Sequence, residues 1–381
     1  MQLDLSSGIL IVGMVQGLFL SLSISLHKNG PIIANRFLVL LLLSFVLALF
    51  VHFLNITNLW KNYLHIYIAS SSVIFLFGPA VYFYVRQLTH SNKRLSWWQL
   101  LHLAPVIINL LMFIPIFQLT PQEVIEGLEQ GQSSSDQKLL LPITKILMVS
   151  IYTIVSLKML YLHHSRIKQH FSDLQKISLI WLRNLLIGFL LFEVIFSVVM
   201  IFGIDLTQIP GKIDTLLSAL LILLIFMTGF HGMQQPEIFR GLSKTDDDSK
   251  NTQQQSEQAN GKYQSSNLNP EDYKSITATL TQLFEQQHIY LNRFLDLRTL
   301  ADEAKMSPHQ LSQFLNEQLN VSFYDYVNQY RINAAKSLLI KTDKAILDIA
   351  LEVGFNNKAT FNKSFKKYNH TTPSQYRAKN Q

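Results

Sequence analysis

The sequence predicts an all-α protein in two unlike parts, a polytopic membrane bundle of seven helices followed by a soluble helical domain. The long apolar windows are confined to the first 235 of the 381 residues. The remainder of the chain is polar and rich in Lys, Gln and Asn. Charged residues make up only 15% of the whole chain, whereas an ordinary soluble domain has about 25%. The low average therefore indicates that one part of the chain lies in lipid and the other in water.

Seven windows predict membrane spans. A spanning helix needs about 20 mainly apolar residues, because the hydrocarbon core is about 30 Å thick. The first four of these windows carry no formal charge, and the full set is 7–26, 37–56, 66–85, 98–117, 139–161, 184–204 and 215–230. No basic residue precedes the first window, so we interpret it as a retained helix and not as a cleaved signal. Residues 1–235 are thus expected to form a seven-span domain whose partner is membrane lipid.

The distribution of basic residues predicts the orientation, since cytoplasmic loops carry an excess of Lys and Arg. With the N-terminus outside, more basic residues fall inside than outside. The inner ones include Lys28, Arg36, Arg86, Lys93, Arg94, Arg166, Lys168 and Lys176, and the outer ones are Lys61, Lys138 and Lys212. This orientation puts the C-terminal domain in the cytoplasm. His163 and His164 are expected on a basic inner loop, facing headgroups and not a metal.

Polar residues within the spans are expensive in lipid and are often functional. Gln16, Asn109 and Glu193 lie near the middle of their windows. One interpretation is hydrogen bonding between neighbouring helices. The other is a sensing site for a ligand or a proton, centred on Glu193. The sequence leaves both interpretations open.

The residue types exclude several kinds of site. The chain has no cysteine, so disulfides, thiolate zinc sites and thiol nucleophiles are ruled out. The spans contain no GxSxG, HExxH or Walker A motif. We therefore expect no enzyme activity, no metal and no cofactor.

Residues 236–270 are expected to form a flexible cytoplasmic linker, because they are polar, of low complexity and poor in residues that build a core. Thirty residues of coil span about 30 Å. Helical periodicity then resumes over 271–287, with Ile276, Leu280, Leu283 and Phe284 on one face. The linker thus separates the membrane part from a soluble domain, residues 271–381.

The first of two helix-turn-helix units is predicted at about 297–319. A short amphipathic helix buries Leu300, Ala301 and Ala304. In the next helix Ser307 is the expected N-cap, Pro308 suits the first helical position, and the residue that completes a capping box is Gln310. Two short helices joined by a tight turn are typical of the helix-turn-helix motif.

The pattern repeats at about 345–368. Gly354 can supply the left-handed conformation that a tight corner needs, and Asn357 is a plausible N-cap for a helix that buries Phe361 and Phe365. A longer helix over 323–340 joins the two units. Its expected inward residues are Tyr326, Val327, Tyr330, Ala334 and Leu338.

The last 28 residues, from Gly354 onward, contain six basic residues and no acidic one. The basic residues are Lys358, Lys363, Lys366, Lys367, Arg377 and Lys379. Such a surface favours contact with the phosphates of a nucleic acid.

Residues from about 291 to 377, a quarter of the chain, resemble the DNA-binding domain of the AraC/XylS family of bacterial transcription regulators. The resemblance rests on ILDIALEVGFNNKATFNKSFKKY, from Ile346 to Tyr368, and on TPSQYR, from Thr372 to Arg377. It implies two helix-turn-helix units that enter adjacent major grooves of promoter DNA. The chain departs from the pattern at His370, where the family usually has glycine.

The resemblance also implies the DNA contacts. The first recognition helix would present His309, Ser312 and Gln313 to base edges and Asn316 to phosphate. The second would present Lys358, Ala359, Thr360 and Lys363 to bases. Gln313 suits adenine, Lys363 suits guanine, and the methyl groups of Ala359 and Thr360 suit thymine. Lys366 and Lys367 would neutralise phosphates. The alternative for these residues is an ordinary solvated helix surface.

Together these features predict a transcription regulator in the bacterial inner membrane. Its single chain contains both a membrane domain that senses a signal and a domain that binds DNA. Its expected partners are promoter DNA, lipid, a second copy of the chain, and an unidentified small-molecule or membrane-state signal. A transporter or membrane enzyme whose helix-turn-helix-like tail binds protein is the alternative.

Overall fold

The computed structural model describes residues 5–27, 31–89, 96–129, 135–174, 177–201, 213–234 and 270–381. These residues are mostly helical and include no β-strand, only one isolated bridge between Phe171 and Asp296. The all-α prediction is therefore confirmed for the part of the chain that is described. Almost all of the expected 236–270 linker lies outside it.

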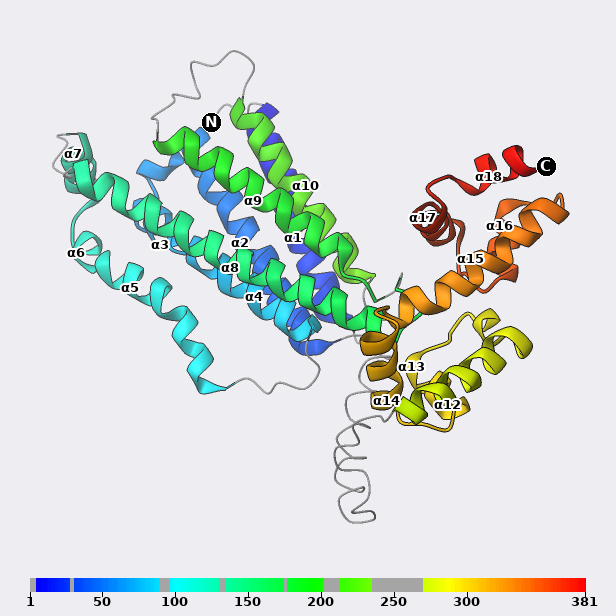
Figure 1. The fold of residues 1–381 in the computed structure, drawn as a ribbon. Helices are drawn as coiled ribbons and strands as arrows, with labels where there is room; N and C mark the ends of the chain where they lie inside the picture. The colour runs from blue at the N-terminus through cyan, green and yellow to red at the C-terminus, as the bar shows by residue number, and fades with distance from the viewer. Residues whose placement is uncertain are drawn as a thin grey trace. The chain divides into compact units, whose positions relative to one another are not determined.

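The chain divides into two compact units (Figure 1). The first comprises Met1–Tyr161 and Leu179–Asp247, and the second comprises Leu162–Ser178 and Asp248–Gln381. The division assigns the segment that follows Tyr161 to the same unit as the C-terminal helices, although about 90 residues separate them in sequence.

The helices of the first unit begin near the N-terminus. They are α1 (Leu5–Leu26), α2 (Ile32–Ile56), η1 (Leu59–Lys61), α3 (Leu64–Ser71), α4 (Ile74–Thr89), η2 (Trp97–Leu103), α5 (Ala104–Met112), α6 (Ile114–Phe117), α7 (Pro121–Glu129), α8 (Ser135–His170), α9 (Ile180–Ile201) and α10 (Ile213–Met233). The last turns of α8 belong to the second unit. Among the described residues, four helical stretches are long and apolar enough to cross a membrane: Leu5–Leu26, Ile32–Ile56, Leu64–Thr89 and Ile143–His170.

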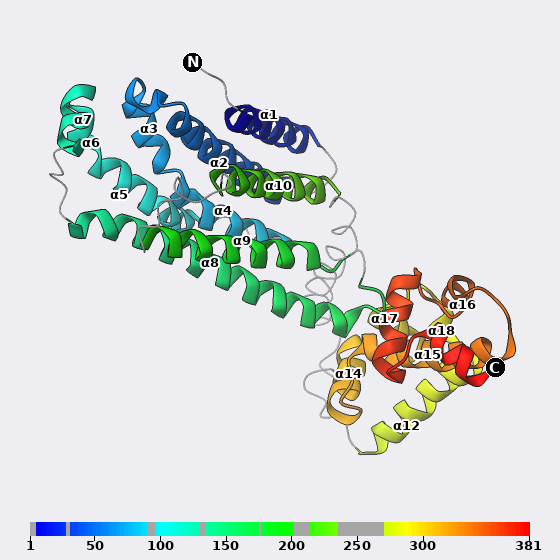
Figure 2. The ribbon, with the colours of Figure 1, turned by 90° about the horizontal axis from the view of Figure 1, so that it is seen from above.

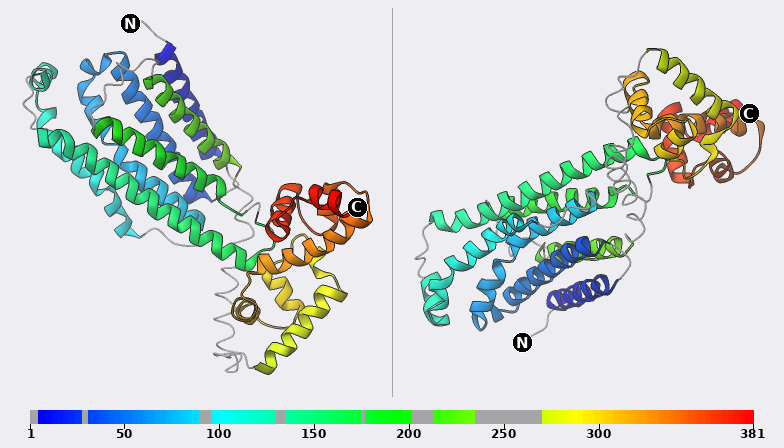
Figure 3. Two further views of the ribbon diagram at one scale, coloured as in Figure 1. Left: turned by 45° about the horizontal axis from the view of Figure 1, so that its top comes forward. Right: turned by 90° about the horizontal axis from the view of Figure 1, so that it is seen from below.

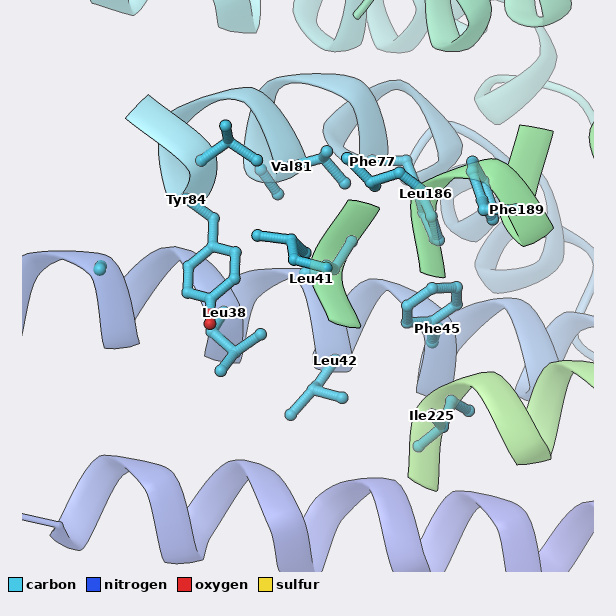
Figure 4. Close-up of a cluster of buried hydrophobic side chains, with 14 of the residues drawn as sticks. Leu38, Leu41, Leu42, Phe45, Phe77, Val81, Tyr84, Leu186, Phe189 and Ile225 are labelled. Atoms are coloured by element: carbon cyan, nitrogen blue, oxygen red, sulfur yellow. The ribbon is translucent and has the colours of Figure 1, made fainter. Parts of the chain in front are cut away.

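Helix α2 is the centre of the first unit and packs against α1, α4 and α10 (Figure 2). Its buried face meets Phe77 of α4 and Phe189 of α9 in one apolar cluster (Figure 4). The Phe45 ring packs edge-on against Phe77 with 4.2 Å between centroids, and Phe77 stacks on Phe189 at 4.8 Å. Aromatic pairs of this geometry add to the stabilisation that burial provides.

Glycines bring α1 and α10 close to their neighbours. A methyl group at Gly13 or Gly17 of α1 would overlap Ile222 or Val46, and one at Gly232 of α10 would overlap Leu38. In lipid no hydrophobic force draws helices together, so close approach through small residues is a main source of helix association. The packing of this unit therefore suits an apolar solvent.

Three features of the first unit differ from the sequence prediction. The window 66–85 is divided into α3 and α4 by a turn, although the whole stretch Leu64–Thr89 is long and apolar enough to cross a membrane. The window 98–117 is not one helix but three short pieces, η2, α5 and α6, and Pro105 and Pro115 stand in the first turns of α5 and α6. Proline lacks the amide hydrogen that a continuous helix needs. The placement of His163 and His164 on a loop was wrong, because α8 continues to His170. The loss of apolar residues after Tyr161 ended the predicted span, but the sequence there contains no helix breaker.

The second unit, whose C-terminal helices are coloured yellow to red in Figure 3, has two hydrophobic cores that share one helix. Its helices are α12 (Pro270–Thr281), the π-helical turn η5 (Gln282–Gln286), η6 (Ile289–Leu291), α13 (Leu297–Glu303), α14 (Pro308–Gln313), the π-helical turn η7 (Phe314–Gln318), α15 (Phe323–Lys341), α16 (Ile346–Glu352), α17 (Lys358–Asn369) and α18 (Pro373–Asn380). Residues of α12 to α14 form one core and residues of α16 and α17 form the other, while α15 contributes to both.

Local hydrogen bonds begin these helices as the sequence predicts. Ser307 and Gln310 form a capping box with Pro308 at the first position of α14. The Asn357 side chain caps α17 by accepting a hydrogen bond of 2.8 Å from the Thr360 amide. These N-caps satisfy amide groups that the first helical turn leaves without a partner.

The turns of the two helix-turn-helix units are built alike. The Met306 amide donates to the Ala301 carbonyl at 3.0 Å, and the Phe355 amide donates to the Ala350 carbonyl at 2.9 Å. These are the bonds of a Schellman motif, which needs a left-handed residue after the helix. Lys305 holds that position in the first helix-turn-helix unit with φ 53°, and Gly354 holds it in the second helix-turn-helix unit with φ 95°.

Gly354 is required for a second reason, which is space. A Cβ atom at this position would lie 2.7 Å from the Tyr290 carbonyl oxygen and 3.0 Å from Nε of Arg331. Lys305 tolerates its side chain, so the two equivalent positions are not equally constrained.

We predict that Gly354→Ala destabilises the second unit by about 2 kcal/mol or more, because a left-handed non-glycine residue costs about 1–2 kcal/mol before any clash. Hydrogen exchange of α16 and α17 in the full chain measures the effect. Lys305→Gly is the matched control and should leave exchange unchanged or slower. Equal acceleration by both substitutions would contradict this explanation.

Candidate nucleic-acid interface

Helix α17 separates a buried face from a basic one. Phe361, Ser364 and Phe365 are buried in the second core. The exposed residues are Lys358, Ala359, Lys363, Lys366 and Lys367, and Thr360 is half-buried. The spacing of three and four residues between Ala359, Lys363 and Lys366 puts these side chains on one helix face. The base-contacting residues expected on this helix are thus accessible from outside.

The equivalent helix of the first helix-turn-helix unit, α14, presents different side chains. Leu311, Phe314 and Leu315 are buried, while His309 and Asn316 are exposed and Ser312 and Gln313 are half-buried. The helix continues beyond α14 through η7 to Gln318. Its accessible side chains are polar but carry none of the Lys residues that α17 presents.

Two of these polar side chains already have partners on their own helix. The Gln313 amide donates to Glu317 at 2.9 Å, and the Asn316 amide donates to the Ser312 carbonyl at 2.8 Å. The predicted site did not include Glu317. If this helix contacts DNA, the Glu317 carboxylate would repel phosphate, and the Gln313 amide would have to leave Glu317 to pair with a base.

Lys367 has a partner that the sequence did not reveal. Its ammonium group donates to Asp325 of α15 at 2.5 Å, and the Tyr368 hydroxyl donates to the same carboxylate at 2.9 Å. Burial raises the pKa of Asp325, but the hydrogen bonds from Lys367 and Tyr368 outweigh burial and leave this pKa below its ordinary value. The contact therefore stabilises the fold at neutral pH and is lost as the pH falls through that lowered pKa. Lys367 thus ties α17 to α15, and contact with phosphate remains a prediction for it.

Arg377 also has a structural role. Its guanidinium donates to the Lys344 carbonyl at 2.7 Å and to the Leu339 carbonyl at 3.3 Å. Of the six basic residues after Gly354, Lys358, Lys363, Lys366 and Lys379 are exposed and lack such contacts in the described hydrogen bonds. The basic surface is therefore narrower than the sequence suggests and lies mainly on α17.

Helix α15 buries a face that the sequence only partly predicted. Val327 is buried as expected, but Tyr326, Tyr330, Ala334 and Leu338 are half-buried against the two cores. The fully buried positions include the polar residues Asn328 and Arg331, which are 0% and 1% exposed. Hydrophobic patterning cannot find such residues, because Asn and Arg usually mark a solvent-facing position.

Arg331 joins the segment before the first helix-turn-helix unit to the second helix-turn-helix unit. Its guanidinium donates to the carbonyl of Tyr290 at 2.8 Å and to the carbonyl of Asn292 at 2.7 Å, both of which precede the first unit. It also lies over the Phe355 ring of the second unit at 5.6 Å. Burial lowers the pKa of Arg331 to about 10, so the group remains charged at neutral pH. This one side chain thus links three segments of the domain.

His370, the departure from the family pattern, ends α17 in the left-handed conformation with φ 59°. Its amide donates to the Lys366 carbonyl at 2.9 Å. The turn that glycine usually makes is therefore kept, at a backbone position that costs about 1–2 kcal/mol for a residue with a side chain.

The expected sensing residues lie on three helices of the first unit. Gln16 of α1 is half-buried, whereas Asn109 of α5 and Glu193 of α9 are buried. The Asn109 carbonyl oxygen accepts a hydrogen bond of 2.7 Å from Ser72, a residue that the sequence did not single out. This bond favours helix-to-helix pairing for Asn109. Among the described residues, no group of three His, Asp or Glu side chains could hold a metal ion.

Comparison with known proteins identifies relatives of the second unit. Residues 300–379 match the sequence model of a family described as a helix-turn-helix domain. An uncharacterized HTH-type transcriptional regulator of Staphylococcus aureus (strain COL) is 37% identical over 98 residues, which are 26% of this chain and 13% of that protein. The uncharacterized HTH-type transcriptional regulator YtdP of Bacillus subtilis (strain 168) is 34% identical over 105 residues, 28% of this chain and 13% of YtdP.

Among solved structures, the C-terminal domain of the two-component response regulator yesN from Fusobacterium nucleatum is 31% identical. The match covers 27% of this chain and 98% of that one, with a TM-score of 0.25. The chain spans about 13% of the length of its first curated relatives. The family match and the curated relatives support a DNA-binding helix-turn-helix domain of the AraC type in this part of the chain.

We predict that Lys363→Ala weakens DNA binding by about 1–3 kcal/mol, through one base-pair position. Lys366→Ala should instead weaken binding evenly across sequences and reduce the salt slope by about 1, because it removes a phosphate contact. Binding measured on operator variants at several salt concentrations separates the two. Identical profiles for both substitutions would contradict the assignment.

Proposed function

We propose that this protein is a membrane-anchored, sequence-specific transcription regulator of the AraC type, which senses a signal through its membrane part. The observation that carries this proposal is the presence, in one chain, of four long apolar helical stretches and of two capped helix-turn-helix units joined by α15. Such a chain can detect a signal and regulate transcription by itself, as a one-component system that needs no phosphorelay partner.

The outer faces of the apolar helices support insertion in a membrane. On α1, Val12, Val15 and Phe19 are 65%, 61% and 65% exposed. On α8, Leu147 and Ile151 are 57% and 59% exposed. Soluble proteins rarely expose contiguous apolar surface of this kind, whereas lipid tails cover it without cost. We take seven spans from the sequence as the working number, with α9 and α10 among them.

The charge distribution supports the expected orientation. Nine basic residues, with Arg183 included, against three favour a cytoplasmic C-terminus. DNA is found in the same compartment, so the topology that the loops favour is the one that a DNA-binding domain requires. This agreement is informative because the loop charges and the helix-turn-helix residues are separate parts of the sequence.

The basic face of α17 would supply most of the attraction to DNA. Lys358 and Lys363 would contact base edges with Ala359 and Thr360, and Lys366 would contact phosphate. His309, Ser312 and Gln313 would read a second half-site with few charges of their own. The buried Arg331 between the units supports a fixed spacing of the two half-sites, as readout of adjacent major grooves requires.

The signal would act by shifting a population of conformations. A small molecule or a membrane state that binds one packing of the spans more tightly would favour that packing. Glu193 and Gln16 are candidates for the sensing site, and the partner of Asn109 makes it a weaker one. A second copy of the chain is the partner that paired operator sites would require.

The topology can be tested by cysteine labelling, because the native chain has no cysteine and therefore no background. We predict that Ser133→Cys, in an outer loop, reacts with a membrane-impermeant maleimide in intact cells. Ser91→Cys, in an inner loop, should react only after permeabilisation. The reverse pattern would contradict the proposed orientation, and labelling of both in the soluble fraction would contradict membrane insertion.

DNA readout can be tested on the full chain in lipid nanodiscs. We predict that it prefers its own operator over random DNA by about 1,000-fold or more at physiological salt, as is typical of specific regulators. The double variant Lys358→Ala/Lys363→Ala should lose most of this preference, while Lys379→Ala should keep it. Binding that shows no sequence preference would favour a tail used for protein interaction.

A further inference from the structure

The loop after α8, residues 171–173, contacts the C-terminal helices of its own unit. The Ser172 hydroxyl donates to the Leu295 carbonyl at 2.5 Å, and the Asn328 amide donates to the Ser172 carbonyl at 3.2 Å. The Asn356 amide donates to the Asp173 carboxylate at 2.5 Å. The backbone of Phe171 forms the isolated bridge with Asp296. The three consecutive residues of the loop thus all make polar contacts with residues between Leu295 and Asn356 of the same unit.

These contacts reach both helix-turn-helix units and the helix between them. Asp296 is the N-cap of α13, the first helix of the first helix-turn-helix unit. Asn356 directly precedes Asn357, the N-cap of α17 in the second unit. Asn328 and Arg331 lie on α15, which joins the units. A single short loop therefore touches the start of a helix in each unit and the connection between them.

The surface that receives the loop is buried and polar. Ser172 is 2% exposed, and Asn328 and Arg331 are 0% and 1% exposed. The guanidinium of Arg331 also donates to the Ser172 hydroxyl at 3.5 Å, and the Asp173 carboxylate opposes the burial effect that lowers the pKa of Arg331. Buried polar groups are costly when they lose a hydrogen-bond partner. Withdrawal of the loop would leave the Asn328 amide without its Ser172 acceptor, so this surface is complementary to the loop.

The sequence provides an independent reason to accept the contact. The positive-inside rule assigns the segment with Arg166, Lys168 and Lys176 to the cytoplasm, together with the C-terminus. Loop and domain therefore share a compartment in the topology that charge favours. Phe171 also directly follows His170, the last residue of α8, so a candidate span leads into the loop without an intervening linker.

We propose that residues 171–173 are a built-in ligand of the DNA-binding domain, which orders its two helix-turn-helix units and couples them to α8. A change at the end of α8 alters the fit of the loop and therefore the relative order of the two units. The effect on DNA rests on the proposed function, whereas the contact itself does not.

Cross-linking in native membranes tests the contact. In the full chain, the pair Asp173→Cys with Asn356→Cys should form a disulfide under mild oxidation, seen as the loss of two thiols to a polyethylene-glycol maleimide. The control pair is Asp173→Cys with Asp343→Cys. Asp343 follows the end of α15, some 15 residues beyond Asn328 and so about 20 Å away along the helix. Cross-linking no higher than in the control would overturn the proposal.

DNA affinity tests the coupling. In the full chain in nanodiscs, Asp173→Ala and Asn356→Ala should each lower affinity for the two-part operator by about 3- to 10-fold, because the units lose their fixed order. Affinity for a single half-site should not change. The double variant should be no weaker than either single variant, since both remove one shared contact. Asp343→Ala is the control and should match the native chain.

The outcomes separate the two proposals. Native chain that binds no DNA specifically would refute the proposed function, and cross-linking would then still decide the contact. Specific DNA binding by the native chain without selective cross-linking would refute the loop contact alone. Selective cross-linking with unchanged operator affinity in Asp173→Ala and Asn356→Ala would refute the coupling.

Discussion

The buried guanidinium of Arg331 is the constraint on which the C-terminal domain depends. It satisfies carbonyl groups of Tyr290 and Asn292, and lies over Phe355. Its presence also limits what can stand nearby, since Gly354 leaves no room for a Cβ atom. Only arginine has a planar group with several fixed donors that can serve two carbonyls and an aromatic face at once. Removing it would leave these carbonyls unsatisfied in the interior, which is more costly than losing an exposed ion pair.

The two helix-turn-helix units share a backbone plan but differ in their surfaces. Both use an N-cap and a Schellman turn, so the same local bonds position both second helices. The first helix-turn-helix unit presents polar side chains that include Glu317, whereas the second helix-turn-helix unit presents lysines. In the proposed function the lysines of α17 supply both base contacts and the charge that attracts DNA of any sequence, whereas the first helix-turn-helix unit contributes base contacts with little charge.

The N-terminal compact unit differs from the DNA-binding domain, because large apolar side chains such as Val12, Val15 and Phe19 are exposed on it. Its helices approach through glycines such as Gly13 and Gly17 and pack aromatic rings in the centre. Helix α8 belongs to both units, since it runs from an apolar stretch into the turns that precede the 171–173 loop. The proposed route from membrane to DNA is therefore a continuous helix and a buried loop, in addition to the linker that composition predicts at 236–270.

The sequence by itself determined the features that depend on near neighbours. The caps at Ser307 and Asn357, the left-handed Gly354 and the buried stripe of α17 each arise from bonds or periodicity within a few residues. Only the tertiary structure decided the features that join distant segments. These features all involve polar residues, which hydrophobic periodicity assigns to solvent. They are the burial of Asn328 and Arg331, the ion pair of Lys367 with Asp325, and the buried contacts of Ser172. Their hydrogen-bond partners lie between 39 and 159 residues away, apart from the Asn328–Arg331 contact. Burial of a polar side chain is costly unless a partner of this kind satisfies it, and a one-dimensional pattern does not contain that information.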